Sequence, residues 1–450
     1  MGSNGVWPAE SEKVCTFEAF FLPASSLLKI QLRACSPAFI PTKKRKTSNP
    51  RNKQNPSLLL YNPHDARHEN RPVPQPSDPH DVLVRIAYVG CCGSDVHFWH
   101  HGGMSRKVSP ANPIVMGHEA SGIVAAVGRG VTSLAPGDRV AIEPGYPCRR
   151  CRACKEGRYN LCKGMRFAAA PGGTTAGNAG GMAKVATHGT LCKYFRIPED
   201  FCYKLGDGDD ADGVSLADAV LVEPLAVAAH AARLADVGPG QDVVVMGSGT
   251  IGLLCAAVAR AFGARTVVVV DVLERKLDFA RRFVPGVHTF LPDPLAAPTN
   301  PTADDSDDDI DGSRADALSE ATAARMISLH SLGGADGDGA DVVLEATGAE
   351  ACVQTGIHVL RSGGTFIQTG LGKPRLRVPM VRMSEKELTL RGCFRYGAGD
   401  FELALGLMRQ GKVSVGMLVS SEVPFERATE AWERTGRGEG IKNLIRGPVD

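Results

Sequence analysis

The pattern of apolar and polar positions divides the chain into a β-rich part and a part in which strands alternate with helices. Aliphatic runs such as SLLLYN from Ser57 and DVLVRIAYVG over 81–90 are separated by Pro-rich turns and predict a β-rich domain that begins at residue 57. From residue 241, QDVVVMGSGTIGLLCAAVARAFGARTVVVVD predicts a strand, a glycine-rich turn, an Ala-rich helix and a second strand. Strand-like runs return over 340–350, 363–372 and 388–396, and residues 425–447 predict an amphipathic helix and a final strand. The predicted fold class is α/β, with a β-rich domain joined to a doubly wound parallel sheet.

Three segments depart from this pattern. Residues 1–56 include the basic run KKRK at 43–46, which a transit peptide or a nuclear signal would explain, but three glutamates before residue 20 argue against a transit peptide. We expect a disordered extension there, such as a misassigned translation start would produce. Residues 172–188 are rich in Gly, Ala and Thr and predict a flexible loop. Residues 293–338 contain six aspartates between 304 and 311 and predict an exposed acidic insertion, with calcium binding as a remote alternative.

Composition narrows the class of protein. A chain of 450 residues predicts two or three domains, and two is the working number. Its 43% hydrophobic content, 22% charged content and net charge of +2 give no electrostatic case for nucleic acid, and no run of 18 apolar residues predicts a membrane span. Thirteen cysteines without a secretory pattern indicate a reducing compartment, so we expect a cytoplasmic protein whose thiols bind metals or pack in the core.

The segment Gly117-His118-Glu119 is the first candidate site. An imidazole beside a carboxylate is a donor pair that zinc accepts, and a buried carboxylate needs a cation. The alternative is a hydrogen-bonded His-Glu pair on a strand. Because further candidate ligands are found elsewhere in the chain, the segment predicts half of a metal site.

A second metal site is predicted from cysteine spacing. Cys148, Cys151, Cys154 and Cys162 follow the pattern C-x2-C-x2-C-x7-C. Four thiolates close a tetrahedral zinc site with no open position, which makes the site structural. An iron-sulfur cluster would use the same ligands.

The glycine-rich turn predicts a dinucleotide site. Gly247, Gly249 and Gly252 form G-x-G-x-x-G between a predicted strand and helix, and Thr250 and Ile251 lie inside the motif. Such glycines permit close approach of the backbone to pyrophosphate, which binds at the helix N-terminus. Asp271 follows Gly252 by 19 positions, near the spacing expected for an acid that binds the ribose hydroxyls, so the expected cofactor is NAD.

Together these motifs resemble the zinc-containing medium-chain dehydrogenases, in particular the polyol dehydrogenases. The resemblance covers about residues 57–450 apart from the two insertions. It implies a GroES-like catalytic domain over 57–225, with the structural zinc lobe at 148–162, and a Rossmann domain over 226–395. Residues 396–450 would complete the catalytic domain.

The resemblance also assigns roles around the catalytic metal. In the run Cys91-Cys92-Gly93-Ser94-Asp95, the cysteine directly before Gly-Ser-Asp is the first zinc ligand, which selects Cys92 and leaves Cys91 as a core side chain. His118 and Glu119 complete the protein ligands. Ser94 and His97 match a hydroxyl and an imidazole that pass the alcohol proton outward. Glu223 stands where alcohol dehydrogenases carry cysteine and polyol enzymes carry glutamate, and would bond a zinc-bound water or exchange into the zinc shell.

Substrate and cofactor contacts follow from the same resemblance. Phe98 and Phe167 would line the substrate cleft, although a threonine usual near Ala170 is missing, and Arg395 and Tyr396 would close it with donors for hydroxyl groups. Thr347 and Gly348 would lie beside the nicotinamide. Lys276 stands where relatives carry an arginine near the adenine ribose, or it is a solvated helix lysine.

The resemblance implies reversible oxidation of xylitol to D-xylulose with NAD and two zinc ions per chain. The shared motifs leave L-arabinitol 4-dehydrogenase and sorbitol (L-iditol) 2-dehydrogenase activity as alternatives. A zinc-binding family member without polyol activity is a more remote one. The expected assembly is a homo-oligomer, a tetramer by family resemblance.

Overall fold

The computed structural model describes residues 54–104, 106–171, 186–206, 213–293 and 313–449. All of them belong to one compact unit, Pro50–Asp450. Within these residues, no helix is long and apolar enough to cross a membrane.

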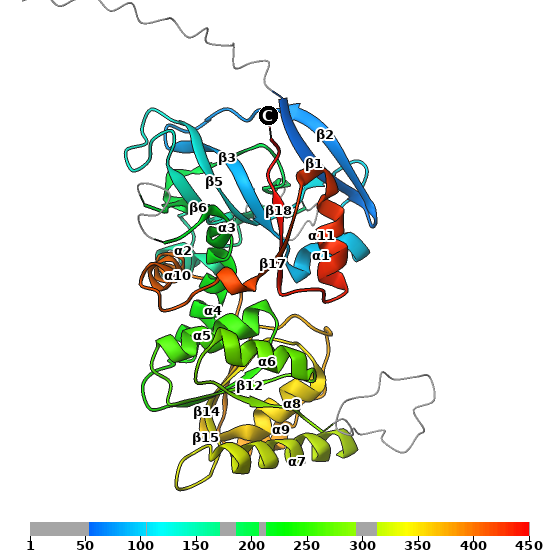
Figure 1. Cartoon of the computed structure of the whole chain (residues 1–450), viewed down its shortest axis with the longest axis vertical. Coiled ribbons are helices and arrows are strands. Elements are labelled where there is room, and N and C mark those ends of the chain that lie inside the picture. The colour runs from blue at the N-terminus through cyan, green and yellow to red at the C-terminus, as the bar shows by residue number, and fades with distance from the viewer. Residues whose placement is uncertain (1–53, 105, 172–185, 207–212, 294–312, 450) are drawn as a thin grey trace, which may run out of the picture. The chain divides into compact units, whose positions relative to one another are not determined.

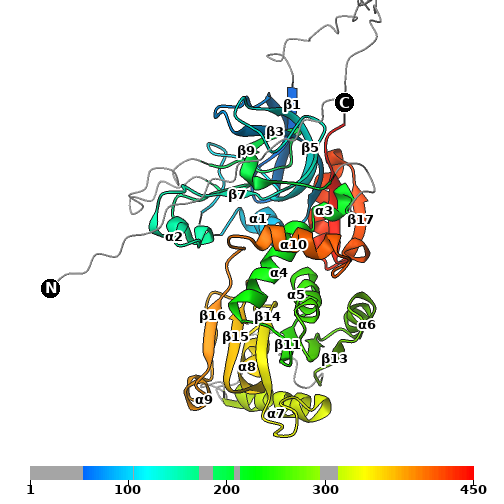
Figure 2. The same cartoon turned by 90° about the vertical axis from the view of Figure 1, so that its left-hand side faces the viewer.

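The first part of the chain, joined by two strands near the C-terminus, forms sheets that are antiparallel except where those two strands pair in parallel (Figures 1 and 2). A seven-stranded sheet has the order β10-β6-β5-β3-β18-β17, and β9 also pairs with β3. Its strands are β3 (Asp81–Gly90), β5 (Glu119–Val127), β6 (Arg139–Ile142), β9 (Tyr194–Pro198), β10 (Cys202–Lys204), β17 (Val419–Val423) and β18 (Lys442–Arg446). The two strands nearest the C-terminus therefore complete a sheet that begins before residue 90.

Smaller elements surround this sheet. A three-stranded sheet has the order β2-β1-β4, and β7 pairs with β8. These strands are β1 (Gln54–Asn62), β2 (Asp65–Pro72), β4 (Ile114–Val115), β7 (Gly145–Tyr146) and β8 (Arg166–Phe167). The helices are α1 (Gly93–His101), α2 (Arg152–Lys155), the 3-10 helix η2 (Tyr159–Leu161), α3 (Leu216–Ala219) and α11 (Ala428–Gly436). Trp99 of α1 packs against Trp432 of α11, with ring centroids 5.6 Å apart in the core of this part.

A six-stranded parallel sheet forms the second part, in the order β13-β12-β11-β14-β15-β16. Its strands are β11 (Asp242–Met246), β12 (Thr266–Val270), β13 (His288–Phe290), β14 (Ala340–Glu345), β15 (Leu360–Gln368) and β16 (Thr389–Gly392). The helices are α4 (Val222–Leu234), α5 (Thr250–Ala261), α6 (Glu274–Phe283), α7 (Ser313–His330), α8 (Glu350–Val359), α9 (Met380–Glu385) and α10 (Asp400–Arg409).

Helices cover both faces of this sheet, as Figure 1 shows for α5 and α6 against α7 and α8. In β11, Val243 and Val245 pack in the cluster that includes α4, α5 and α6, whereas Val244 and Met246 pack in the cluster that includes α7 and α8. Successive side chains of a strand point to opposite faces, so a strand covered on both faces must be apolar throughout. This requirement explains the uninterrupted valine runs.

The structure corrects three of the predicted segments. Strand β1 begins at Gln54, so residues 54–56 belong to the fold, while residues 1–53 lie outside the described residues. Of the predicted flexible loop, residues 172–185 also lie outside them, but Thr187 exchanges two backbone hydrogen bonds with Ala170 at 2.9 and 3.1 Å. The other domain limits are not tested by these observations and stay predictions.

The third correction concerns the acidic insertion. Residues 294–312 lie outside the described residues, but residues 313–330 form α7, which packs on α8. Ser319, Ala323 and Met326 of α7 are buried. The prediction of an exposed insertion over 313–338 was wrong. It relied on the charge of the aspartate run and overlooked this helical spacing of small and apolar positions.

Candidate active site

Strand pairing brings the predicted catalytic metal ligands together. Cys92 lies between β3 and α1, and Glu119 is the first residue of β5, which pairs with β3 so that Gly90 is opposite Glu119. Ligand atoms of Cys92, His118 and Glu119 lie within 4.8 Å of one another. The thiolate, imidazole and carboxylate of this group form a donor set that suits zinc, and three protein ligands leave a fourth position open.

Asp95 supports this group from the first turn of α1. One oxygen of its buried carboxylate lies 3.5 Å from His118 Nδ1, and the other accepts the Cys92 backbone N–H at 3.0 Å. Burial alone would lower the pKa of His118, but the charges of Asp95 and Cys92 outweigh it and raise that pKa well above its usual value. A carboxylate behind a ligating histidine fixes the orientation of its ring.

Lys442 is a buried cation at the same site. Its ammonium donates to both Glu119 carboxylate oxygens at 2.9 and 2.7 Å and to the Cys91 carbonyl at 3.1 Å. The charge of Glu119 is thus balanced within the protein. The burial of Glu119 is therefore weaker evidence for a metal ion than the sequence suggested. The convergence of three donor atoms is the stronger evidence.

Glu223 and Ser94 lie in the first turns of two helices, α4 and α1, and His97 lies in the middle of α1. Glu223 is buried in the first turn of α4, where burial raises the pKa of its carboxyl and His118 partly offsets the rise. Ser94 and His97 are three residues apart on α1, so they share one face of that helix. Ser94 is half-buried and His97 is exposed.

Aromatic and cationic side chains form a wall beside the metal ligands. The Phe167 ring lies 5.7 Å from the His118 ring, and the Arg395 guanidinium carbon lies 3.6 Å from the Phe167 centroid. Tyr396 is buried, with a hydroxyl that has no hydrogen-bond partner within the described part of the chain. Phe98 is partly buried against the core of the β-rich part.

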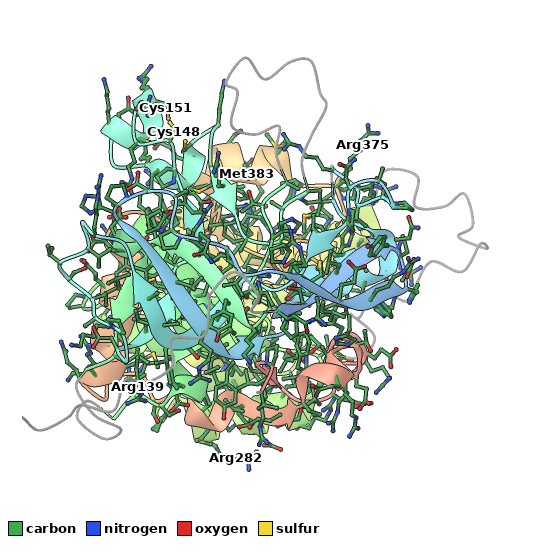
Figure 3. The ribbon with its side chains drawn as sticks, turned by 90° about the horizontal axis from the view of Figure 1, so that it is seen from above. Arg139, Cys148, Cys151, Arg282, Arg375 and Met383 are labelled. Carbon is green, nitrogen blue, oxygen red and sulfur yellow. The ribbon has the colours of Figure 1, made fainter. Side chains whose placement is uncertain are left out.

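The four remaining predicted metal ligands form a separate cluster. Ligand atoms of Cys148, Cys151, Cys154 and Cys162 lie within 4.8 Å of one another, and Figure 3 shows Cys148 beside Cys151 at the edge of the molecule. Backbone N–H groups of Cys148 and Cys151 point at thiol sulfurs, each at 3.4 Å. Backbone donors at residues 150 and 151 lower the pKa of Cys148, which favours the thiolate that a metal needs.

The glycine-rich turn lies between β11 and α5, as predicted. A side chain at Gly252 would collide with the Gly247 carbonyl, so the close contact of turn and helix requires glycine, and Gly249 is the N-cap of α5. Thr250 begins α5 and donates to the Ile441 carbonyl at 2.8 Å, and Ile251 is partly buried.

Asp271 follows β12 and is held against this turn. One of its oxygens accepts from the Ser248 backbone N–H and hydroxyl at 2.9 and 2.7 Å, and the other accepts from the Leu273 N–H at 3.1 Å. Lys276 lies 3.9 Å away. The oxygen that accepts only from Leu273 retains a free lone pair, so the group can also accept a ribose hydroxyl.

Glu345 organises the loops that follow β14 and β15. Its fully buried carboxylate accepts the backbone N–H groups of Thr347 and Gly348 at 2.7 and 2.9 Å and the Gln368 amide at 2.6 Å. Its own carbonyl accepts from Thr369 and Gly370. One residue thus fixes both loops at the carboxyl ends of adjacent parallel strands, where open α/β sheets bind ligands.

Comparisons with known proteins agree with this geometry. The profile described as "Alcohol dehydrogenase GroES-like domain" matches residues 78–207, and the one described as "Zinc-binding dehydrogenase" matches residues 250–410. Probable D-xylulose reductase A of Aspergillus clavatus is 45% identical over 397 residues, which cover 88% of this chain and 98% of the relative. D-xylulose reductase A of Aspergillus oryzae is 44% identical over 398 residues with the same coverage. The chain belongs to the zinc-binding dehydrogenase family.

Solved structures confirm the predicted fold of this dehydrogenase, a GroES-like domain with a Rossmann-like parallel sheet. An Escherichia coli oxidoreductase/dehydrogenase of unknown specificity matches with a TM-score of 0.72 and 29% identity, covering 88% of this chain and all of that one. L-idonate 5-dehydrogenase of Escherichia coli matches with a TM-score of 0.68 and 25% identity, covering 88% and 98%. The predicted family and reaction class, an oxidoreductase, are also confirmed.

Sequence reasoning missed several polar residues that hold the site of this dehydrogenase. Asp95 could have been found, because it lies three residues after Cys92 in the same motif. Lys442 and Glu345 carried no such signal. Lys442 reaches Glu119 across 323 positions, and Glu345 contacts loops whose proximity depends on the strand order.

Proposed function

We propose that this dehydrogenase oxidises xylitol reversibly to D-xylulose, with transfer of a hydride to NAD. The observation that carries the proposal is identity of 44 to 45% over almost the full length of D-xylulose reductases. The three-donor cluster, with Glu223, Phe167 and Arg395 around it, supports the same function. Glutamate at position 223 favours the polyol branch over the alcohol branch.

Cys92, His118 and Glu119 would hold the catalytic zinc. Their donor atoms converge, and Asp95 and Lys442 fix the ring and the carboxylate behind them. When bound, zinc would supply a Lewis acid that lowers the pKa of the substrate hydroxyl. Cys148, Cys151, Cys154 and Cys162 would hold a second zinc, whose closed site contributes folding free energy.

The proton of the substrate hydroxyl leaves through this chain's own groups. Ser94, half-buried on α1, accepts it, and His97, exposed on the same helix face, releases it to solvent. Glu223 would hydrogen-bond a water at the open position of a bound zinc. Its carboxyl is buried and close enough to His118 and Glu119 for their charges to act on its pKa.

Substrate and cofactor contact opposite sides of the cleft. Arg395 donates to the hydroxyl groups of the polyol, Tyr396 offers a hydroxyl that has no partner among the described residues, and Phe98 and Phe167 bound the carbon chain. Gly247, Gly249, Thr250, Ile251 and Gly252 receive the pyrophosphate. Asp271 and Lys276 bind the adenosine ribose, and Thr347 and Gly348 border the nicotinamide.

We also propose that the protein works in the cytoplasm as a homo-oligomer, with a tetramer as the expected state. Zinc thiolate sites need reduced cysteines, and every cysteine in the described residues is free. Strand β16 is exposed along its whole length at an edge of the parallel sheet, beside exposed Phe394, Met380 and Val381. An exposed edge strand favours pairing with another chain, and the apolar side chains near it would be buried by such pairing. Light scattering measures the assembly.

The deciding experiment is a panel of pentitols and hexitols assayed with NAD and NADP, with the ketose product identified. Xylitol with NAD should give the highest kcat/KM, and the product should be D-xylulose. Higher kcat/KM on L-arabinitol or sorbitol would move the assignment to those activities. No turnover of any polyol, with zinc bound, would refute it.

A variant at the catalytic ligand provides the control for this assay. Cys92→Ser should abolish turnover and lower the zinc content from two to one per chain, because a thiolate is lost while the four-cysteine site is untouched. Cys91→Ser should retain both zinc ions. Full activity in Cys92→Ser would transfer the ligand role to another residue.

A further inference from the structure

Arg395 holds an unusual backbone conformation beside the proposed catalytic site. Its φ is 59°, in the left-handed region that residues with a side chain seldom adopt. This conformation lets its guanidinium lie 3.6 Å from the Phe167 ring centroid and 4.7 Å from that of Phe394. Such a conformation persists only where surrounding contacts enforce it.

The contacts that flank Arg395 come from the four-cysteine lobe. Asn160 Nδ2 donates to the carbonyl of Phe394, the preceding residue, at 3.0 Å. The Tyr159 hydroxyl lies 3.2 Å from the carbonyl of Gly397, two residues after Arg395. Both side chains belong to η2, the turn directly before Cys162. Because the Tyr159 hydroxyl has one proton, Asn160 supplies the hydrogen bond that holds the segment before the strained residue, and Tyr159 contacts the segment after it.

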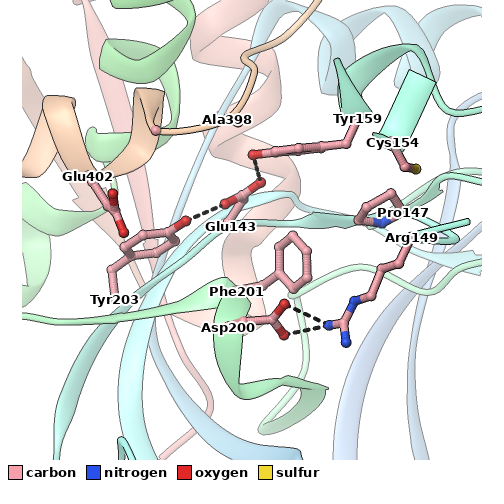
Figure 4. A pocket seen from close by; sticks show the side chains of 11 residues that line it. Glu143, Pro147, Arg149, Cys154, Tyr159, Asp200, Phe201, Tyr203, Ala398 and Glu402 are labelled. Carbon is pink, nitrogen blue, oxygen red and sulfur yellow. Dashed lines mark hydrogen bonds and ion pairs between the residues drawn. The ribbon is translucent and has the colours of Figure 1, made fainter. Parts of the chain in front are cut away.

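The turn that carries these donors is itself fixed to the β-rich part. The Tyr159 and Tyr203 hydroxyls donate to the two oxygens of Glu143 at 2.5 and 2.8 Å, and Figure 4 shows Glu143 between the two phenol rings. Glu143 is fully buried and Asn160 is 7% exposed. Because buried carboxylates are stable only when their hydrogen bonds are made, this junction has little freedom to shift.

We propose that Asn160, assisted by Tyr159, is a positioning residue that holds Arg395 in the substrate cleft, so that the four-cysteine lobe sets polyol recognition. The inference rests on the proposed function in that Arg395 is taken to bind polyol hydroxyls. Asn160 acts through Arg395 and does not touch the substrate. Its loss should therefore weaken binding of the polyol and leave cofactor binding unchanged.

The kinetic test uses Asn160→Ala and the equal-sized Asn160→Asp, which lacks the N–H donor. Both should raise KM for the preferred polyol about tenfold, the effect of about 1.4 kcal/mol, with kcat, NADH affinity and zinc content close to those of the unmutated protein. The control is Leu161→Ala, a neighbouring side chain that is 49% exposed. Unchanged KM in both Asn160 variants would overturn the proposal.

A double-mutant cycle separates positioning from general loosening. In an Arg395→Ala background, Asn160→Ala should have no further effect on KM, because the group that it positions is already gone. Additive effects would show that Asn160 acts by another route and would overturn the proposal.

A third measurement needs no turnover. Phenylglyoxal labels accessible guanidinium groups, and peptide mass spectrometry should find Arg395 labelled several times faster in Asn160→Ala than in the unmutated protein. Arg152, whose side chain is 89% exposed, is the internal reference. Equal labelling of Arg395 in both proteins would overturn the proposal. If the unmutated protein oxidises no polyol, the proposed function fails, and the labelling still decides whether Asn160 holds Arg395.

Discussion

Removal of the Lys442 ammonium should destabilise the protein strongly. The Lys442 and Glu119 side chains are 3% and 2% exposed, so no solvent can replace the contacts of 2.7 and 2.9 Å that join them. Loss of one partner of a buried pair leaves an uncompensated charge and costs about 3 to 5 kcal/mol. Lys442→Met, which keeps the length of the side chain, should lower the free energy of unfolding by about that amount.

Urea unfolding followed by tryptophan fluorescence measures this loss, because Trp99 and Trp432 lie together in the core of the β-rich part. Lys412→Met, at an exposed position, is the matched control and should change the free energy by less than about 0.5 kcal/mol. Adding Glu119→Gln to Lys442→Met should recover part of the stability, because no unpaired charge then remains.

The same prediction can be tested by comparing the zinc-loaded protein with the protein after chelation. A metal ion at the Cys92 cluster would supply another cation for Glu119, so the loss caused by Lys442→Met should be larger after chelation than in the zinc-loaded protein. If Lys442→Met unfolded at the same urea concentration as Lys412→Met, with and without zinc, the argument from charge burial would be refuted.

Three further predictions test other parts of the structure. Cys154→Ser should lower the zinc content by one ion and reduce thermal stability, because it opens a closed metal site; full zinc content at normal stability would contradict it. Asp271→Ala combined with Val272→Arg should shift the ratio of kcat/KM for NADP over NAD upward by about tenfold or more, since it removes a negative charge and adds a phosphate partner; equal use of both cofactors by the unmutated protein would contradict the role of Asp271. Burial raises the pKa of Glu143 to about 7, so the folded state holds this proton more tightly than the unfolded chain does, and the free energy of unfolding should fall from pH 5 to pH 8. In Glu143→Gln, urea titrations at each pH should show a fall that is smaller by up to about 3 kcal/mol.

Local motifs made much of the fold and of the candidate site predictable. The cysteine spacing and the glycine-rich turn each lie within about twenty residues, and their chemistry is set by residues that are neighbours in the sequence. The valine runs of β11 and β12 predicted the strands that flank this turn, because β-branched residues favour strands. These elements require only short-range reasoning.

The residues that hold the site in place could not be predicted in the same way. Asn160 meets Phe394 across 234 positions, and Lys442 meets Glu119 across 323. Each is an ordinary polar residue in its local sequence, and only the packing of distant segments gives it a partner. The prediction of an exposed acidic insertion failed for a related reason, because two of the three buried positions of α7 are the small residues Ser319 and Ala323, and its buried face becomes evident only against α8.

The place of β18 in its sheet has a consequence for synthesis of the protein. This strand lies between β3 and β17, although its residues leave the ribosome more than 350 positions after those of β3. Until then residues 88–90 of β3, beyond the segment 81–85 that pairs with β9, lack their partner on this edge, and Glu119 lacks the ammonium of Lys442. A nascent chain that stops short of residue 442 would therefore expose an open strand edge and an unbalanced charge, both of which favour aggregation or degradation over a stable, partly active product.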